Sequence, residues 1–168
     1  MTAMYNVGSD NLVPQKSTDG SNPVSADTAG YTLAVATYYI PLASSEGPTV
    51  SECFLASFHV KWSAALAATI TVESTNYPAT IGSAGTGRAD VTDWDTTAGN
   101  WIQENPTNNL TFSIGGAGNS VTAQTIVAGG TNAGAVIMYI ANAAARRYRL
   151  KVVVTTGGTL RAGSCGKD

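Results

Sequence analysis

Alternation of apolar and polar residues predicts short strands along most of the chain. In residues 54–62 every second position is apolar, and His59 and Lys61 stand between apolar neighbours. Residues 68–74 repeat this pattern. A period of two with such contrast is typical of a strand that buries one face. The short connection between the two segments predicts that they form a hairpin.

The clearest alternation lies near the end of the chain. In residues 147–154, bulky apolar side chains alternate with two arginines and one lysine. Gly157 and Gly158 then predict a turn into a final strand that runs from Thr159 to about Gly163. Further strands are expected at residues 31–40, 101–102, 110–114, 121–127 and 135–140.

Two details complete the prediction of elements. The run 135–140 is apolar throughout, so we expect a central strand with both faces buried. Only residues 64–68 and 141–145 favour a turn of helix. Eight or nine strands without a long helix indicate an all-β protein, an antiparallel β-sandwich of jelly-roll-like architecture formed by residues 31–168. One sequence does not reveal the order of the strands.

Residues 1–30 show no periodicity and are rich in Ser, Asp, Gly, Asn and Pro. Such a segment is ordered only where other groups hold it in place. We therefore expect an extended N-terminal arm that docks either on its own body or on a neighbouring subunit. We favour the second alternative, in which residues 1–30 embrace a neighbour, and Tyr5, Leu12 and Val13 are the candidate interface residues.

Charge is scarce and unevenly distributed. Charged residues make up 12% of the chain, about half the usual share, which points to a surface covered by neighbours. Residues 1–104 hold ten acids and three bases, a net charge of −7, and residues 105–168 hold six bases and one acid, a net charge of +5. Opposite charges either meet within one fold or join copies head to tail. For the second alternative, Arg146, Arg147 and Arg149 are the candidate contacts between subunits.

The sequence lacks the motifs of catalysis and of several partner classes. His59 is the only histidine, and no nucleophile elbow, phosphate-binding loop or zinc helix accompanies it. Cys53 and Cys165 do not form a metal spacing. We expect no enzyme activity and no cofactor. A pI near 5.2 argues against nucleic acid, and the absence of a long apolar run or signal peptide argues against a membrane and favours synthesis in the cytoplasm.

Two weaker alternatives involve acidic and aromatic residues. Asp90, Asp93 and Asp95 are a candidate calcium site, although the spacing differs from an EF-hand and a solvated turn explains it equally. Glu73 with Glu104 or Asp95 is a candidate carboxylate pair for glycoside hydrolysis. Aromatic residues either line a carbohydrate groove or, more often, fill the core. These residues are Tyr31, Tyr38, Tyr39, Tyr77, Trp94 and Trp101.

Several tracts resemble small virion structural proteins of tailed bacteriophages. They are Val72-Glu73-Ser74, WIQENP at 101–106, ARRYRLKVV at 145–153, Gly157-Gly158-Thr159 and Gly166-Lys167. The resemblance covers roughly residues 54–167, excludes the arm and contains no diagnostic motif. It implies a capsid decoration or cement protein of the virion, which associates with itself, for example as a trimer, and with the major capsid protein. A tail, knob or fibre-base protein and a carbohydrate-binding module are the alternatives.

Overall fold

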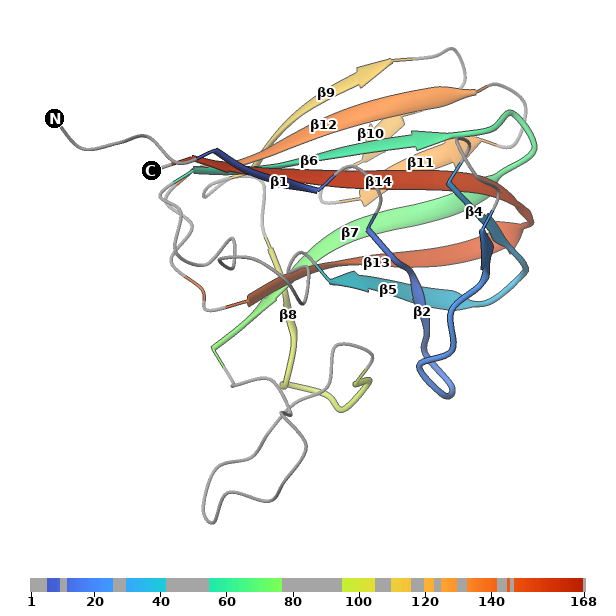
Figure 1. Ribbon diagram of the computed structural model, residues 1–168, viewed down its shortest axis with the longest axis horizontal. Coiled ribbons are helices and arrows are strands. Elements are labelled where there is room, and N and C mark those ends of the chain that lie inside the picture. Colours follow the sequence, from blue (N-terminus) through green and yellow to red (C-terminus); the bar gives the residue numbers. More distant parts are fainter. Residues whose placement is uncertain are drawn as a thin grey trace, which may run out of the picture.

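Two antiparallel β-sheets packed face to face form the described part of the chain (Figure 1). The computed structural model describes residues 6–9, 12–25, 30–41, 55–76, 95–104, 110–115, 120–122, 125–129, 133–141, 145 and 147–167. These residues contain strands and turns but no helix. Accordingly, the described residues include no helix that could span a membrane. The prediction of an all-β sandwich is confirmed.

Each sheet contains seven strands. The first sheet has the order β3 (Val24–Ser25), β4 (Tyr31–Leu33), β14 (Gly158–Lys167), β6 (Leu55–Trp62), β12 (Gly134–Ala141) and β9 (Leu110–Gly115), and β1 (Asn6–Ser9) pairs with β14. The second has the order β10 (Ser120–Thr122), β11 (Thr125–Gly129), β7 (Ala67–Thr75), β13 (Arg147–Thr156), β5 (Thr37–Pro41) and β2 (Gln15–Lys16), and β8 (Ile102–Gln103) pairs with β7.

The strand order is that of a jelly roll. Four neighbouring strands of the first sheet are β4, β14, β6 and β12, and four of the second are β5, β13, β7 and β11. Along the chain, β4 to β7 alternate between the sheets, and so do β11 to β14. This double-sheet arrangement defines the jelly roll.

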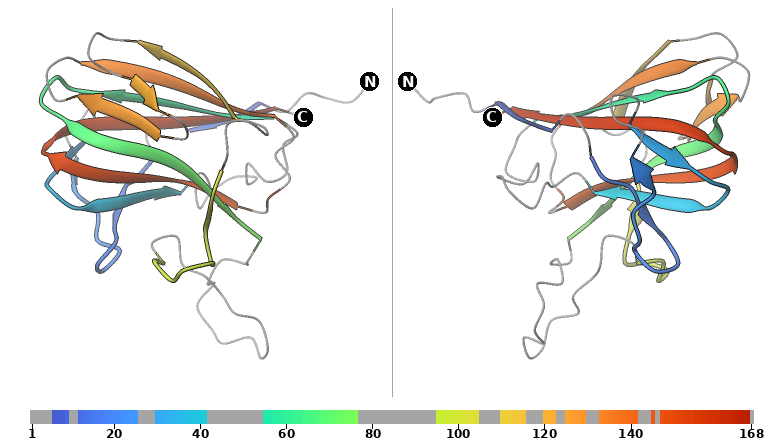
Figure 2. Two further views of the ribbon diagram at one scale, coloured as in Figure 1. Left: turned by 180° about the vertical axis from the view of Figure 1, so that it is seen from behind. Right: turned by 45° about the vertical axis from the view of Figure 1, so that its right-hand side comes forward.

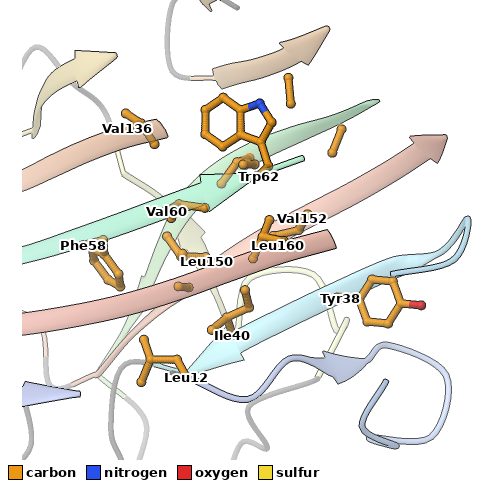
Figure 3. Packing of buried hydrophobic residues seen from close by; sticks show 14 of the residues in the cluster. Leu12, Tyr38, Ile40, Phe58, Val60, Trp62, Val136, Leu150, Val152 and Leu160 are labelled. Atoms are coloured by element: carbon orange, nitrogen blue, oxygen red, sulfur yellow. The ribbon is translucent and has the colours of Figure 1, made fainter. Parts of the chain in front are cut away.

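The core lies between the sheets (Figure 3). Phe58, Val60 and Trp62 reach into it from β6, and Leu150 and Val152 meet them from β13. Each of these side chains is at most 2% exposed. The alternation predicted for both strands is confirmed, because the residues between them face away from the core.

The predicted hairpin of residues 54–74 and the predicted turn at Gly157-Gly158 are both corners between the sheets. β6 and β7 lie in different sheets, as do β13 and β14. The two corners pack on each other: the Ser63 amide donates to the Thr159 carbonyl, and the Thr159 amide donates to Ser63 Oγ, both over 3.0 Å. A Cβ on Gly158 would lie 2.6 Å from the Leu66 nitrogen, so only glycine fits there. Turn residues mark a reversal but not the sheet that the next strand joins.

Other predicted elements divide or change type. Residues 31–40 form β4 and β5 in different sheets, and residues 121–127 contribute to both β10 and β11. Residues 64–68 form a turn and the start of β7, so the predicted helical turn is wrong there. Of the second predicted helical turn, 142–144 lie outside the described residues, and Ala141 ends β12.

β12 buries only one face, contrary to the prediction for residues 135–140. Val136, Met138 and Ile140 are buried in the core, whereas Tyr139 is 47% exposed. β12 lies next to the terminal strand of the first sheet, and among the described residues no element covers its outer face (Figure 2). An uninterrupted apolar run therefore does not by itself establish burial of both faces.

The described residues of the predicted arm dock on the chain's own body. β1, β2 and β3 pair with β14, β5 and β4 respectively. Leu12 is 4% exposed within the core, and its amide donates to the Ala162 carbonyl over 2.8 Å. The described residues of the arm therefore follow the first docking alternative and not the favoured one, and Leu12 packs in the chain's own core instead of at a contact with a neighbour. Val13 is 37% exposed, and Tyr5 lies outside the described residues.

Because Leu12 belongs to the core, we expect Leu12→Ala to lower the free energy of unfolding by about 2–5 kcal/mol. The neighbouring Val13→Ala is the control and should change it by no more than about 0.5 kcal/mol. Urea denaturation followed by tryptophan fluorescence measures both. Equal, small effects would show that the N-terminal segment is not part of the folded unit.

Candidate functional site

A buried arginine organises the outer face of the second sheet. Arg149 on β13 faces away from the core, between Tyr148 and Leu150, yet is only 2% exposed. It stands directly opposite Glu73 of β7. Arg149 Nε donates to Glu73 Oε2 over 2.7 Å, and Nη2 lies 2.6 Å from the same oxygen. Charge-assisted bonds of this kind are the strong ones in proteins.

Two aromatic rings complete the surroundings of this guanidinium. Arg149 Cζ lies 3.6 Å from the ring centroid of Tyr39 and 4.1 Å from that of Trp101. Arg147 Cζ lies 5.1 Å from the Trp101 centroid. Aromatic faces attract cations, and most strongly when water is excluded. Arg149, Glu73, Tyr39 and Trp101 are called the guanidinium cluster below.

The fourth member of the cluster belongs to a segment that crosses to this face. Residues 95–104, the strap, include β8 and run downward past β13 in Figure 1. The Glu104 amide donates to the Val72 carbonyl over 2.8 Å, and Arg149 Nη1 donates to the Asp95 carbonyl over 2.9 Å. The strap is therefore bound to the sheet through both its backbone and the guanidinium.

A compact turn opens the strap. The Thr97 amide and hydroxyl donate to Asp95 Oδ1 over 3.0 and 2.8 Å, and Asn100 Nδ2 donates to Oδ2 over 2.6 Å. Gly99 adopts a φ of 87°, a conformation that glycine takes without strain. Trp101, which follows this turn, is thereby directed onto Arg149.

Burial and hydrogen bonding shift three pKa values here. Burial lowers the pKa of Arg149, and the Glu73 carboxylate opposes that effect. Burial raises the pKa of Tyr39 against the charge of Arg149. For Asp95, burial acts to raise the pKa, but hydrogen bonds from Asn100 and Thr97 outweigh it and the pKa lies below its ordinary value. The cluster thus holds a cation with its counter-ion inside the chain.

The hydrogen bonds and ion pair of Arg149 join strands β13 and β7 to the strap. All the bonds of Arg149 described above go to groups of the same chain. Glu73 is bound to this cation, and the candidate carboxylate pair of Glu73 with Glu104 or Asp95 stays a prediction. Lys151 Nζ approaches Glu73 Oε1 to 3.6 Å from the solvent side, where its side chain is 38% exposed.

The structure describes two of the three arginines expected at subunit contacts. Arg149 is buried within its own chain, Arg147 is half-buried beside Trp101, and Arg146 lies outside the described residues. At Arg149 and Glu73, acidic and basic halves of the chain meet across one sheet. This pair follows the first of the two charge alternatives.

The candidate calcium ligands cannot be brought together from the described residues. Asp90 and Asp93 lie outside them, and Asp95 accepts hydrogen bonds within its own turn. Among the residues that the structure describes, no three His, Cys, Asp or Glu side chains gather as a metal site requires. The calcium site therefore stays a prediction.

The aromatic residues divide between core and strap. Tyr38 belongs to the core, Tyr39 and Trp101 are buried around Arg149, and Tyr31 is half-buried. Tyr77 and Trp94 lie outside the described residues. His59 is exposed on the outer face of the first sheet, where Ile137 and Gly163 stand opposite it.

One flank of the sandwich derives from a segment without charge. Residues 105–145 contain no Asp, Glu, Lys, Arg or His. They supply β9 and β12 at one edge of the first sheet, and β10 and β11 at one edge of the second. These strands gather on the same side of the molecule (Figure 2). We call β9 to β12 the uncharged flank.

Comparison with models of protein families, with curated proteins and with solved structures found no match. The likeness to phage virion proteins consequently remains an expectation from the sequence.

We expect Glu73→Gln to lower the free energy of unfolding by about 3–5 kcal/mol, because it leaves a buried guanidinium without its counter-ion. Lys151→Met is the matched control: it removes an exposed partner of the same carboxylate and should cost less than about 1 kcal/mol. Urea denaturation at neutral pH compares the two. Similar losses of unfolding free energy in the two variants would mean that the buried Arg149 does not need Glu73 as its counter-ion.

Asp95 should make the strap sensitive to acid. Its folded-state pKa is lowered, so the stability it contributes is present above the ordinary carboxyl pKa of about 3.9 and is lost as pH falls through the lower folded value. Asp95→Asn should be less stable than wild type at pH 6 and should lose less stability on acidification. Denaturation curves between pH 6 and pH 3 test this, and parallel pH profiles would contradict it.

Proposed function

We propose that the protein is a non-enzymatic structural subunit of a phage virion, most specifically a capsid decoration or cement protein. In this role it is made in the host cytoplasm, binds the major capsid protein at the capsid surface and associates with copies of itself. A trimer is one candidate assembly.

The uncharged flank carries this proposal. A free monomer in solution usually distributes charge around its surface, whereas the centres of protein interfaces are depleted of charge. Here the described charged side chains lie elsewhere: the guanidinium cluster occupies the outer face of the second sheet, and Lys61 and Arg161 stand opposite each other on β6 and β14. A flank of four strands without one charge favours a protein that works in contact with others.

The guanidinium cluster supports the non-enzymatic part of the proposal. Its bonds bind the strap to the sheet and leave the cation covered by two rings. A jelly roll is also found in viral capsid and lectin domains, but a fold alone does not decide between such functions. The resemblance to phage virion proteins is the reason to prefer the first.

Binding to particles tests the proposal. Heads of the phage that carries the gene, assembled with that gene inactivated, are mixed with purified protein. We expect saturable binding at a fixed number of copies per head and a higher temperature of head disruption. Heads already carrying the protein are the control and should take up none.

Imaging of labelled particles separates the remaining alternatives. Label over the head supports a decoration protein, whereas label confined to the tail or fibre base would replace it with the tail alternative. Failure to bind particles, together with binding on a glycan array that chelator abolishes, would favour the carbohydrate-binding module.

A further inference from the structure

We propose that the outer edge of β9 is a self-association site, where β9 of a second copy pairs with it antiparallel across a two-fold axis. This inference deepens the proposed function, on which it rests for its biological setting. It identifies which part of the uncharged flank contacts another copy.

β9 differs in length from the other strands at the ends of the sheets. β2 and β3 have two residues each and β10 has three, whereas β9 has six. Very short terminal strands limit unwanted pairing, because they present few free backbone donors and acceptors. Within the described residues, no strand pairs with β9 on the side away from β12. This edge is therefore the longest one that the sheet order leaves open.

The sequence of β9 also lacks the usual protection of an edge. Residues 110–115 read LTFSIG, without lysine, other charge or proline. Natural edge strands are commonly protected by such residues, and an unprotected edge is a template for another strand. A soluble protein needs some protection along such an edge, and the described residues supply none. A strand of another molecule paired with β9 would provide that protection.

The occupant is a second copy because neutral strands suit a two-fold pairing. Across such an axis each residue meets the same segment of its partner, so any charge on the strand would face a like charge. The lack of charge across residues 105–145 removes this repulsion. A strongly charged partner would find no complementary charge on the flank.

The strand beside β9 supplies apolar surface next to the proposed contact. Tyr139 of β12 stands opposite Thr111 and is 47% exposed, and Ile137 stands opposite Ser113 and is half-buried. Tyrosine is enriched at protein interfaces, where its ring gives area and its hydroxyl remains able to bond. A second sheet edge placed along β9 would extend over this neighbourhood.

Charge substitution on β9 tests the inference. In LTFSIG the polar positions alternate with apolar ones, so Thr111 and Ser113 are the positions at which the strand best tolerates a charge. The double variant Thr111→Lys, Ser113→Lys should weaken self-association about a hundredfold or more, because like charges meet across the axis. The corresponding double Glu variant should do the same. An equimolar mixture of the two should associate again.

Analytical ultracentrifugation measures the mass, and circular dichroism checks that each variant is folded. Wild type should sediment as two chains of 17.2 kDa. Thr32→Lys is the control, because Thr32 is exposed on β4 and the edge of β4 is already paired with β3. This variant should leave the dimer intact. A wild-type monomer, a trimer or association unaffected by the β9 charges would overturn the inference.

Failure of the β9 contact can be distinguished from failure of the proposed virion function. A monomer that binds phage heads would refute the β9 contact and leave the virion role standing, whereas a dimer that ignores heads would do the reverse. If the Lys variant keeps the mass of wild type but loses binding to heads, the edge serves the capsid protein and the self-association proposal is wrong.

Discussion

A buried guanidinium must have an anion and acceptors within reach, and this requirement shapes the outer face of the second sheet. Arg149 lies on the side of β13 that solvent would ordinarily cover, yet it is enclosed by Glu73, Tyr39 and Trp101. The strap completes this enclosure with the Trp101 ring and the Asp95 carbonyl. The strap in turn is bound where its carbonyl accepts from Arg149. The ion pair and the strap consequently stabilise each other, and neither is a separate feature.

The fold class could be predicted because strand alternation is a local property. The period of two in β6, β7 and β13 identified the residues that face the core, and Phe58 and Leu150 lie there as expected. Sheet membership could not be predicted in the same way. Gly158 marks a reversal of the chain, but its role as a corner comes from the Leu66 backbone packed against it, a contact distant in sequence. The same limit applies to Leu12, whose short apolar neighbourhood has no period.

Only part of the guanidinium cluster could be predicted from the sequence. Alternation placed both Glu73 and Arg149 on outward faces, which normally predicts exposed charges. Their pairing depends on β7 and β13 being neighbours, and their burial depends on Trp101, which approaches from the strap. A strand order would have revealed the pair. Nothing local to residues 95–104 indicates that they cover a sheet.

The distribution of charge links these features to assembly. The chain has few charged residues and uses two of them, Arg149 and Glu73, to attach its own strap, so they are not available to keep neighbouring molecules apart. The uncharged flank includes β9, whose six residues pair with no described strand on the side away from β12. An edge of that length, without charge or proline, is a template for pairing with another strand. Under the self-association proposal, a second copy provides the protection that the described residues of this flank do not provide.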